Sequence, residues 1–447
     1  MRKVLIVSYF YPPCHRVGGV RPSKFSRYLP EFGWQPRILT VRPDGLPAEF
    51  TMEVPEAWVT RTMALDVNFI PRLVIGRERV AHQGFHSLGA RRFGGLLEVL
   101  GSWYRDIVDF PDPEIGWFPF AIAAGRRIIQ QERPAVIVSS SVPFTSHLVA
   151  ARLAARAGLP WVADFRDLWT DAHNWRRRDP IRSLEIRLER LVMRRAAAVV
   201  TVSKPWAERL RRYGRPVYAI PNGYDEADYP DEPAATQLPD RSRFTLAYTG
   251  TLTPGKQDPA LLMEAVAALR RKEVVTPENF QVTMVGWYLD HARRAAEQWG
   301  VTDLVRVSPA LAQDEANRLC RNSSALLFFS WSRGRGDVEH GWYSAKVFGY
   351  LACGRRILAV GPGMDMGSRL IERSRAGVVA RTAEEVESVL RSWIEEYRCT
   401  GALSVAIDQS QVTPFSRRAQ AGRLAQVLDR VTATAAERIT EEVGITD

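Results

Sequence analysis

The chain has 447 residues, of which 46% are hydrophobic and 25% charged, a composition typical of globular proteins that excludes a disordered or fibrous one. This length exceeds what one hydrophobic core usually serves, so it predicts two domains of about 200 residues each. The 61 Lys and Arg outnumber the 50 Asp and Glu, which gives a net charge of +11. Such a charge fits a phosphate-bearing substrate, an anionic membrane or nucleic acid, and equally an arginine-rich surface that faces water.

The cysteines and the N-terminal segment indicate the compartment. No spacing typical of a disulfide framework or a zinc site occurs among Cys14, Cys320, Cys353 and Cys399. The opening MRKVLIVSYFYPP has a short apolar run that stops at two prolines without a cleavage-like sequence, which favours a first buried strand over a signal peptide. No run of 18 apolar residues is present, so no bilayer span is expected. We therefore predict a cytoplasmic protein.

The first half of the chain alternates strand-like and helix-like segments. Apolar runs typical of buried parallel strands fall on residues 3–10, 36–41, 135–141, 160–165 and 198–203. Helical patterns fall on residues 20–32, 145–158 and 181–196. This repetition predicts a doubly wound parallel sheet. Residues 60–125, rich in aromatic residues and arginine, are predicted as a helical insertion, with lining of an acceptor site or docking on a membrane as alternatives.

The second half repeats the same alternation after a Pro-, Asp- and Glu-rich linker near residues 224–242. Strands are predicted at 244–250, 281–287, 325–330, 355–361 and 376–380. Helices are predicted at 258–272, 314–322, 344–354, 383–397 and 416–431. The predicted organisation is an N-terminal domain over 1–230, a C-terminal domain over 243–412, a closing helix over 413–431 and a tail over 432–447.

Two glycines follow the first predicted strand directly. In open α/β sheets ligands bind beyond the carboxyl ends of the strands. Gly18 and Gly19 would let the backbone approach a ligand, and the helix that begins there would offer free N–H groups to an anion. The turn lacks the G-x-G-x-x-G pattern, so a purely structural turn is an equal alternative.

The stretch VADFRDLWTD brings charge to the end of another predicted strand. Asp164 and Arg166 stand where packing gives little reason for charge, which favours a functional role. The alternative is a group of ion pairs that braces a loop.

Two lysines of the second half are placed to meet an anion. Lys256 lies on a glycine-containing loop before a helix, where it would neutralise a diphosphate, and a surface lysine is the alternative. Lys346 lies near the start of a helix, where a cation is slightly unfavourable unless an anion is bound. No D-x-D pair occurs in the chain, so no metal is expected on a nucleotide diphosphate and cations would carry that charge.

The motifs together resemble the retaining GT-B glycosyltransferases of family 4. They are, in order, YFYPP…GG, SSSVPFTSHL, ADFRDLWTD, VVTVSKP, IPNGYD, YTGTLTPGKQDP and AKVFGYLACGRRILAVG, and they span about residues 1–430. The resemblance implies an α/β GT-B fold, which has two facing Rossmann-like domains with a cleft between them. It also implies sugar transfer from a nucleotide sugar, with front-face attack in which cations stabilise the leaving phosphate.

The resemblance also implies the site residues. The implied donor-binding positions are Gly18, Gly19, Gly250, Thr251, Lys256, Ser308, Pro309, Glu339, Lys346 and Gly349. The implied catalytic residues are Asp164, Arg166 and Lys256, the first two on the acceptor side.

The chain departs from the family pattern in two places. Thr251 replaces an arginine that often precedes the diphosphate lysine. Gly341 and Gly349 replace two glutamates, the second of which normally holds the ribose hydroxyls. Glu339 is the candidate substitute for the first, and no nearby residue substitutes for the second.

The predicted function is metal-independent, retaining sugar transfer to a sugar, lipid-linked or natural-product acceptor, in polysaccharide, glycolipid or natural-product assembly. The alternatives are a catalytically altered or non-catalytic GT-B protein and a nucleotide-sugar epimerase or phosphorylase. No nucleic-acid partner is expected, because the basic residues are not interleaved with a stacking platform. The basic, amphipathic residues 174–196 predict either peripheral contact with an anionic membrane or an ordinary crossover helix.

Overall fold

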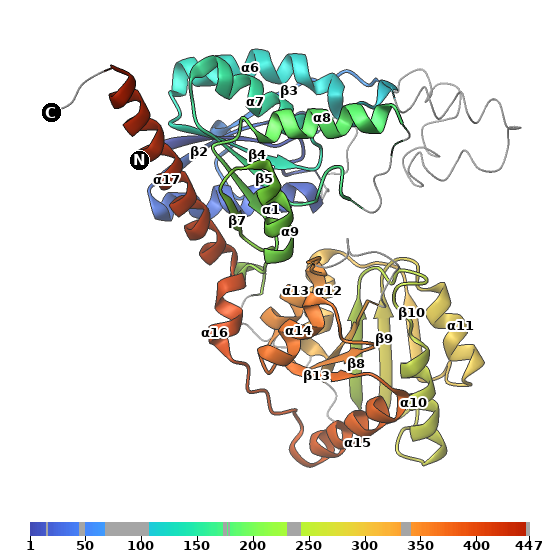
Figure 1. The fold of residues 1–447 in the computed structure, drawn as a ribbon. Coiled ribbons are helices and arrows are strands. Elements are labelled where there is room, and N and C mark those ends of the chain that lie inside the picture. Colours follow the sequence, from blue (N-terminus) through green and yellow to red (C-terminus); the bar gives the residue numbers. More distant parts are fainter. Residues whose placement is uncertain are drawn as a thin grey trace, which may run out of the picture. The chain divides into compact units, whose positions relative to one another are not determined.

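The computed structural model describes residues 1–14, 17–43, 50–67, 107–172, 177, 179–229, 243–331 and 341–443. The chain divides into two compact units (Figure 1). Unit 1 comprises Met1–Ile220 and Ala421–Asp447, and unit 2 comprises Pro221–Gln420. The chain thus leaves unit 1 ten residues before the boundary expected at 230 and returns to it at its C-terminal end.

Unit 1 is built on a seven-stranded sheet of order β3-β2-β1-β4-β5-β6-β7. Its strands are β1 Arg2–Val7, β2 Trp34–Val41, β3 Val59–Thr62, β4 Val136–Ser141, β5 Trp161–Phe165, β6 Ala198–Thr201 and β7 Val217–Ala219. Every pair is parallel, and Val4 of β1 lies opposite Pro36 of β2 and Val136 of β4. The central strands are apolar on both faces because helices cover both faces of a parallel sheet. The predicted doubly wound parallel sheet is confirmed.

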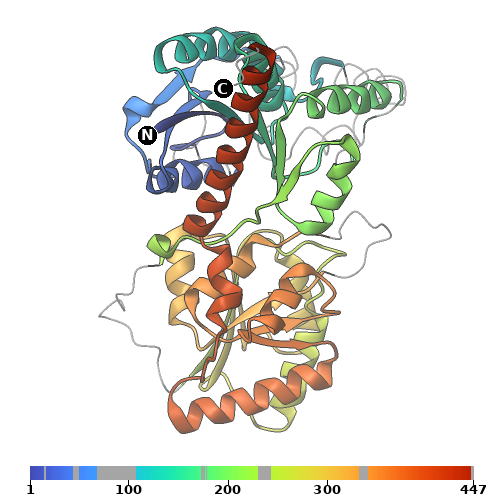
Figure 2. The same cartoon turned by 60° about the vertical axis from the view of Figure 1, so that its left-hand side comes forward.

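The helices of unit 1 include one from the far end of the sequence. They are α1 Val17–Tyr28, α6 Phe118–Glu132, α7 Thr145–Ala157, α8 Ile181–Met193, α9 Lys204–Leu210 and α17 Arg417–Val443. The ribbon of α17 runs alongside the rest of unit 1 (Figure 2). Its Leu424 and Leu428 pack in one hydrophobic cluster with Phe25 and Trp34. The closing helix therefore belongs to the core of unit 1, and it extends well beyond residue 431, where the sequence predicted a tail.

The two ends of the predicted insertion are part of the fold of unit 1. β3 pairs with β2 at the edge of the sheet, and α6 packs on α7. The insertion predicted over 60–125 was therefore too long at both ends. Residues 68–106, which form its middle, lie outside the described residues.

Unit 2 is built on a six-stranded sheet of order β10-β9-β8-β11-β12-β13. Its strands are β8 Phe244–Thr249, β9 Phe280–Val285, β10 Val305–Ser308, β11 Ala325–Phe329, β12 Ile357–Val360 and β13 Gly377–Ala380. All of these pairs are parallel as well. The predicted second α/β domain is thus confirmed as a fold.

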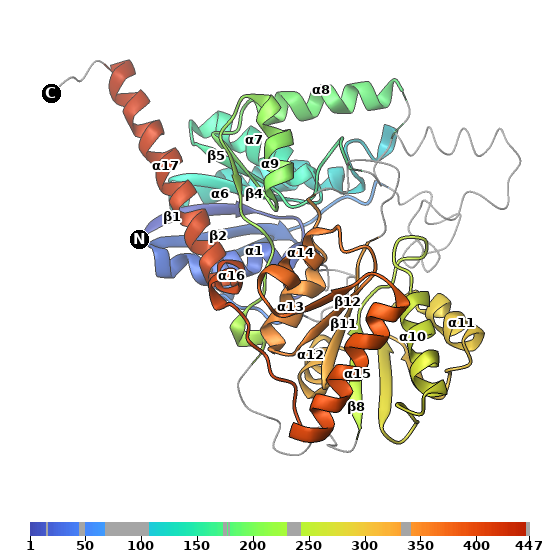
Figure 3. The same cartoon turned by 60° about the horizontal axis from the view of Figure 1, so that its bottom comes forward.

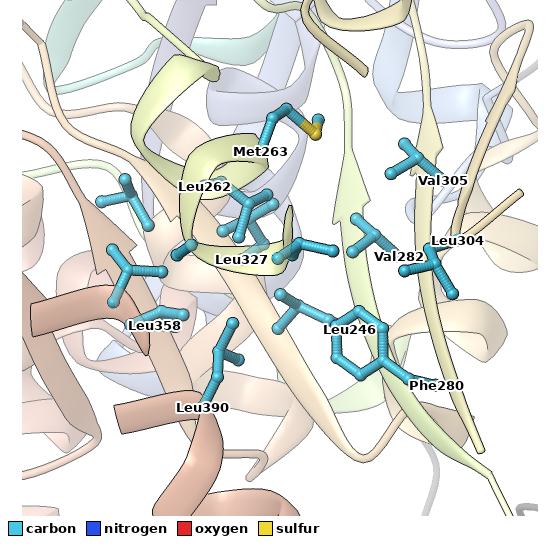
Figure 4. Packing of buried hydrophobic residues seen from close by; sticks show 14 of the residues in the cluster. Leu246, Leu262, Met263, Phe280, Val282, Leu304, Val305, Leu327, Leu358 and Leu390 are labelled. Carbon is cyan, nitrogen blue, oxygen red and sulfur yellow. The ribbon is translucent and has the colours of Figure 1, made fainter. Parts of the chain in front are cut away.

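Helices pack on both sides of this second sheet. They are α10 Ala260–Arg271, α11 Asp290–Gln298, α12 Gln313–Asn322, α13 Ala345–Cys353, α14 Met366–Arg373, α15 Ala383–Thr400 and α16 Gln409–Val412. α10 and α15 lie side by side (Figure 3). Leu262 from α10 and Leu390 from α15 join Leu246, Phe280 and Leu327 of the strands in one core (Figure 4). None of the described helices is long and apolar enough to cross a bilayer.

The strand orders locate one ligand-binding edge in each unit. In unit 1 the order reverses between β1 and β4, and in unit 2 between β8 and β11. Ligands of open α/β sheets bind beyond the carboxyl ends of the strands at such switch points. The loops that follow these strands are therefore where each unit's site is sought.

Candidate functional site

The two glycines of unit 1 lie at the start of α1, against the loop that follows β1. A Cβ atom built on Gly18 would lie 3.0 Å from Cδ2 of Phe10 and 3.2 Å from Nη1 of Arg166. A Cβ atom on Gly19 would lie 3.1 Å from the Cα of Tyr11. Both glycines thus allow the helix and the loop to pack closely, which is the structural role the sequence left open. Their place beside donor phosphates stays a prediction.

Asp164 is wholly buried in an ion pair with Arg21 of α1. Its carboxylate accepts from Nε of Arg21 at 2.9 Å and from the hydroxyl of Ser140 at 3.0 Å. Arg21, 1% exposed, also donates to the backbone oxygen of Ile220 at 2.8 Å. This geometry is that of the alternative reading, an ion pair that braces neighbouring elements. Asp164 offers no exposed oxygen to a substrate, so its predicted catalytic role has no direct geometric support.

Arg166, by contrast, is partly open to solvent. Its side chain is 15% exposed and its Nε donates to the carboxylate of Asp167 at 3.2 Å. Within the described part of the chain, no acceptor receives a hydrogen bond from Nη1, the atom beside Gly18. Of the predicted residues of unit 1, the structure therefore brings together Gly18 and Arg166.

In unit 2, two glycines bring the ends of β8 and β9 into contact. Gly250 has a φ of +105°, which favours glycine, and its N–H donates to the backbone oxygen of Val285 at 2.7 Å. A Cβ atom built on Gly286 would lie only 2.0 Å from the backbone oxygen of Gly250. The carboxyl ends of the two strands can meet this closely only because Gly286 has no side chain.

Lys346, in the first turn of α13, reaches into this corner. Its Nζ donates to the hydroxyl of Tyr248 and to the backbone oxygen of Thr251. A Cβ atom on Gly250 would lie 2.7 Å from the Cε of Lys346, so Gly250 also makes room for the lysine. The structure thus brings together Gly250, Thr251 and Lys346, three of the predicted donor-binding residues, at the switch point of unit 2.

The electrostatics of this corner are unusual for a lysine. Desolvation lowers the pKa of Lys346 from its usual range to about 7. Burial also raises the pKa of Tyr248 well above its usual value, so this phenol remains neutral. No carboxylate of the described residues forms an ion pair with Lys346. The amine is held by two neutral oxygens, and a bound anion would supply its missing counter-charge.

Lys256 lies on the loop between β8 and α10, next to Gln257, whose side chain is fixed by two hydrogen bonds. Gln257 donates from its side-chain nitrogen to the backbone oxygen of Phe329 at 2.9 Å and accepts from the N–H of Thr253 at 3.1 Å. These bonds tie the loop to the end of β11. Nζ of Lys256 lies 5.9 Å from the ring centroid of Trp331, which lies two residues beyond the end of β11.

The remaining predicted positions of unit 2 are spread along the same edge. Ser308 ends β10, and its backbone oxygen accepts from the N–H of Gly286 at 3.2 Å. Pro309 is exposed just beyond it. Gly349 lies one turn along α13 from Lys346, and the hydroxyl of Tyr229 occupies the space above it. Glu339 lies outside the described residues.

Three residues of these sites were not predicted from the sequence. Arg21 looked like an ordinary helix residue, and only its pairing with Asp164 distinguishes it. Tyr248 looked like an apolar strand residue, although its hydroxyl donates to the backbone oxygen of Thr251 at 2.6 Å. Tyr229 stood in a segment that was taken as linker. No local sequence signal marked these three residues.

Two all-parallel sheets, each with helices on both sides and a cluster of polar groups at its switch point, define the class as α/β proteins of GT-B fold. Similar solved structures include sucrose-phosphate synthase from Thermosynechococcus elongatus, with a TM-score of 0.50, 13% identity and 100% of both chains covered. HepE from Anabaena, in complex with UDP-glucose, gives a TM-score of 0.50 at 13% identity, covering 99% of this chain and 100% of that one. A glycosyltransferase from Rickettsia africae gives a TM-score of 0.53 at 12% identity, covering 100% of this chain and 99% of that one.

The similarity in sequence to a known family lies mainly in unit 1. Residues 23–228 match the model of Glycosyltransferase Family 4. The matched segment includes Asp164 and Arg166. No curated protein matches the chain in sequence. The expected resemblance to GT-B glycosyltransferases of family 4 is thereby confirmed: residues 23–228 match the family's model, and the solved structures share the fold.

Proposed function

We propose that the protein transfers a sugar from a nucleotide sugar to an acceptor with retention and without a metal ion, in the cytoplasm. The observation that carries this proposal is Lys346, an amine without a described carboxylate at the switch point of unit 2. A nucleotide diphosphate supplies the negative charge that this amine lacks. The UDP-glucose held by HepE is a ligand of this chemical class.

Unit 2 is proposed to stabilise the leaving group. Lys346, Lys256 and the free N–H groups at the start of α13 would face the diphosphate, whose negative charge grows as the sugar departs. The absence of a D-x-D pair from the sequence agrees with cations in this role. Gly250 and Thr251 would present the backbone to the same phosphates.

Unit 1 is proposed to contribute the acceptor side. Arg166, with Nη1 directed at Gly18, is the candidate for contact with the acceptor or the donor phosphates. Asp164 would act as a positioning residue through Arg21, which it holds next to the loop that follows β1. The acceptor is proposed to be a sugar, a lipid-linked sugar or a natural product.

The test is donor hydrolysis and transfer with a panel of UDP-, GDP- and TDP-sugars. We expect nucleotide release with at least one donor, an unchanged rate in EDTA and a product with the donor's anomeric configuration. The Lys346→Met variant serves as the control for release at this site. No binding and no nucleotide release with any donor would refute the proposal.

We propose further that α8 contacts an anionic membrane surface. Its two glutamates point inward, where Glu185 accepts from Nε1 of Trp169 at 3.0 Å and Glu189 accepts from the hydroxyl of Thr170. The outer face is then basic, with the exposed Arg187 and Arg190, and also carries Leu184 and Leu191, which are 49% and 59% exposed. Leucines surrounded by arginines suit a lipid interface.

Flotation with liposomes tests this contact. We expect binding to vesicles with anionic lipid, weakening with salt, and its loss in a Leu184→Ser/Leu191→Ser variant. Equal flotation with neutral vesicles, or none with either, would contradict it.

A second candidate is a GT-B protein with altered chemistry. Gly349 and Thr251 favour it, since each replaces a charged residue of the family pattern. Such a protein would bind a nucleotide sugar without transferring the sugar, or would epimerise it without an acceptor. An NMR time course of enzyme with the donor alone detects epimerisation, and ordinary transfer by the wild type would exclude this candidate.

A further inference from the structure

The place of a side chain at position 349 is taken by a tyrosine from another segment. A Cβ atom built on Gly349 would lie 2.7 Å from the hydroxyl oxygen of Tyr229 and 3.8 Å from its Cζ. Real Cβ atoms do not approach oxygen this closely, so any side chain at 349 would have to displace the tyrosine. A side chain at position 349 and the hydroxyl of Tyr229 therefore cannot occupy this space together.

Tyr229 is held in this position by a capped turn. The turn Glu226–Asp228 is a 3₁₀ helix, and the carboxylate of Asp225 accepts from the N–H of Ala227 at 3.0 Å. The N–H of Tyr229 donates to the backbone oxygen of Glu226 at 3.0 Å. The side chain of Asn317 donates to the backbone oxygen of Asp228 at 3.3 Å, and this hydrogen bond joins the turn to α12. The ring is therefore positioned by its own backbone.

The hydroxyl of Tyr229 has no explanation in packing. The ring packs against the hydrophobic cluster that contains Phe348 and Leu351, a role that phenylalanine would fill equally. No hydrogen bond joins this hydroxyl to the described residues. This hydroxyl is not among the buried, unpaired polar atoms of the described residues, so it reaches solvent and is available to hydrogen-bond a ligand.

Helical spacing relates the hydroxyl of Tyr229 to the amine of Lys346. Residues 346 and 349 are three apart on α13, so Lys346 and the hydroxyl over Gly349 lie one above the other on the same helical face. A ligand whose phosphates meet Lys346 would bring neighbouring neutral groups toward Tyr229. In a nucleotide sugar those groups are hydroxyls, of the ribose or of the transferred sugar.

We propose that Tyr229 is a specificity-determining residue of the donor site, whose hydroxyl binds a hydroxyl group of the nucleotide sugar in the space left by Gly349. This inference rests on the proposed function. Burial raises the pKa of Tyr229 far above neutral pH, so the phenol keeps its proton and both donates and accepts.

The test measures binding to Tyr229→Phe by calorimetry, with the nucleotide that the wild type binds in the UDP, GDP and TDP panel. Three probes are used: the nucleotide sugar, the nucleoside diphosphate, and its 2′,3′-dideoxy analogue. The loss of one hydrogen bond should weaken binding by about 2- to 10-fold. If the ribose is bound, the first two probes weaken and the dideoxy analogue does not. If the transferred sugar is bound, only the nucleotide sugar weakens.

Tyr224→Phe is the matched control, because Tyr224 packs on the same cluster from the same segment without standing over Gly349. It should leave all three affinities unchanged, and both variants should unfold as the wild type does. Equal affinity of wild type and Tyr229→Phe for every probe would overturn the inference and leave the proposed function intact. A wild type that binds no probe would instead overturn both.

Discussion

Each unit places a cation near the carboxyl edge of its sheet, and the two cations have opposite surroundings. In unit 1, Arg21 is 1% exposed and lies 2.9 Å from a carboxylate oxygen of Asp164. In unit 2, Lys346 meets only a phenol and a backbone oxygen among the described residues, and burial lowers its pKa to about 7. The first charge is neutralised within the fold, whereas the second has no ion-pair partner among the described residues.

Under the proposed function, this difference separates charge that serves the fold from charge that serves binding. A buried ion pair whose hydrogen bonds are satisfied has nothing left to offer a substrate. An amine that neutral oxygens hold gains most when an anion arrives. The sequence made Asp164 and Lys346 look alike, as charged residues where packing gives no reason for charge, and only their partners distinguish them.

The largest expected effect comes from breaking the pair in unit 1. Asp164→Asn leaves the guanidinium of Arg21 buried without a counter-charge, which should cost about 3–5 kcal/mol of the free energy of unfolding. Urea denaturation measures this loss, and hydrogen exchange of the β5 amides assigns it to unit 1. The double variant Arg21→Met/Asp164→Leu should be far more stable than Asp164→Asn. Lost turnover with unchanged unfolding would instead identify Asp164 as catalytic.

Removing the amine of unit 2 should affect binding instead of folding. Lys346→Met deletes a charged partner of the diphosphate, worth about 1.5–3 kcal/mol, so donor affinity should fall roughly 10- to 150-fold. Calorimetry with the active nucleotide sugar measures the fall, and thermal unfolding should show no loss of stability. A variant that binds the donor as the wild type does would remove Lys346 from the site.

The lowered pKa of Lys346 makes the affinity for the donor depend on pH. An anion binds the charged amine, so binding above pH 7 must take up a proton, and affinity falls as pH rises through the pKa of about 7. We expect a loss of about tenfold between pH 6 and pH 8 for a nucleotide sugar, whose phosphates do not titrate there. Lys346→Arg should abolish this dependence, because arginine stays charged. An equal slope in both proteins would contradict the assignment.

The smallest expected effect concerns the space shared by Gly349 and Tyr229. Replacing glycine by alanine inside a helix usually stabilises by about 1 kcal/mol. In the wild type this gain should disappear, because the new Cβ meets the tyrosine hydroxyl at 2.7 Å. In a Tyr229→Phe background Gly349→Ala should recover it. Urea denaturation of the four proteins measures the coupling, and equal gains in both backgrounds would show that the two positions are independent.

Much of the fold was predictable because buried parallel strands leave a clear record in sequence. The apolar runs that became β1, β4, β8 and β11 were found from hydrophobicity alone. Short edge strands such as β3 and β10 were missed, since they are only partly buried and resemble loops. The length of α17 was missed because residues 432–437 are mostly exposed and carry no apolar periodicity.

Only some residues of the candidate site could be predicted from the sequence. Lys346 followed from its position at a helix start, whereas Gly250 was implied only by the family resemblance. The partners of these residues come from contacts between elements that are distant in sequence. Arg21 meets Asp164 across 143 positions, and Tyr248 meets Lys346 across 98. No pattern read along the chain reports such pairs.

The return of the chain to unit 1 has a consequence for biosynthesis. Unit 2 is one uninterrupted stretch, Pro221–Gln420, nested within unit 1. Unit 1 needs Leu424 and Leu428 to complete the cluster around Phe25 and Trp34, and both residues are synthesised only after the whole of unit 2. Domains generally fold in the order in which they emerge. Here the nested unit is complete first, and the N-terminal half awaits the C-terminal helix before its core closes.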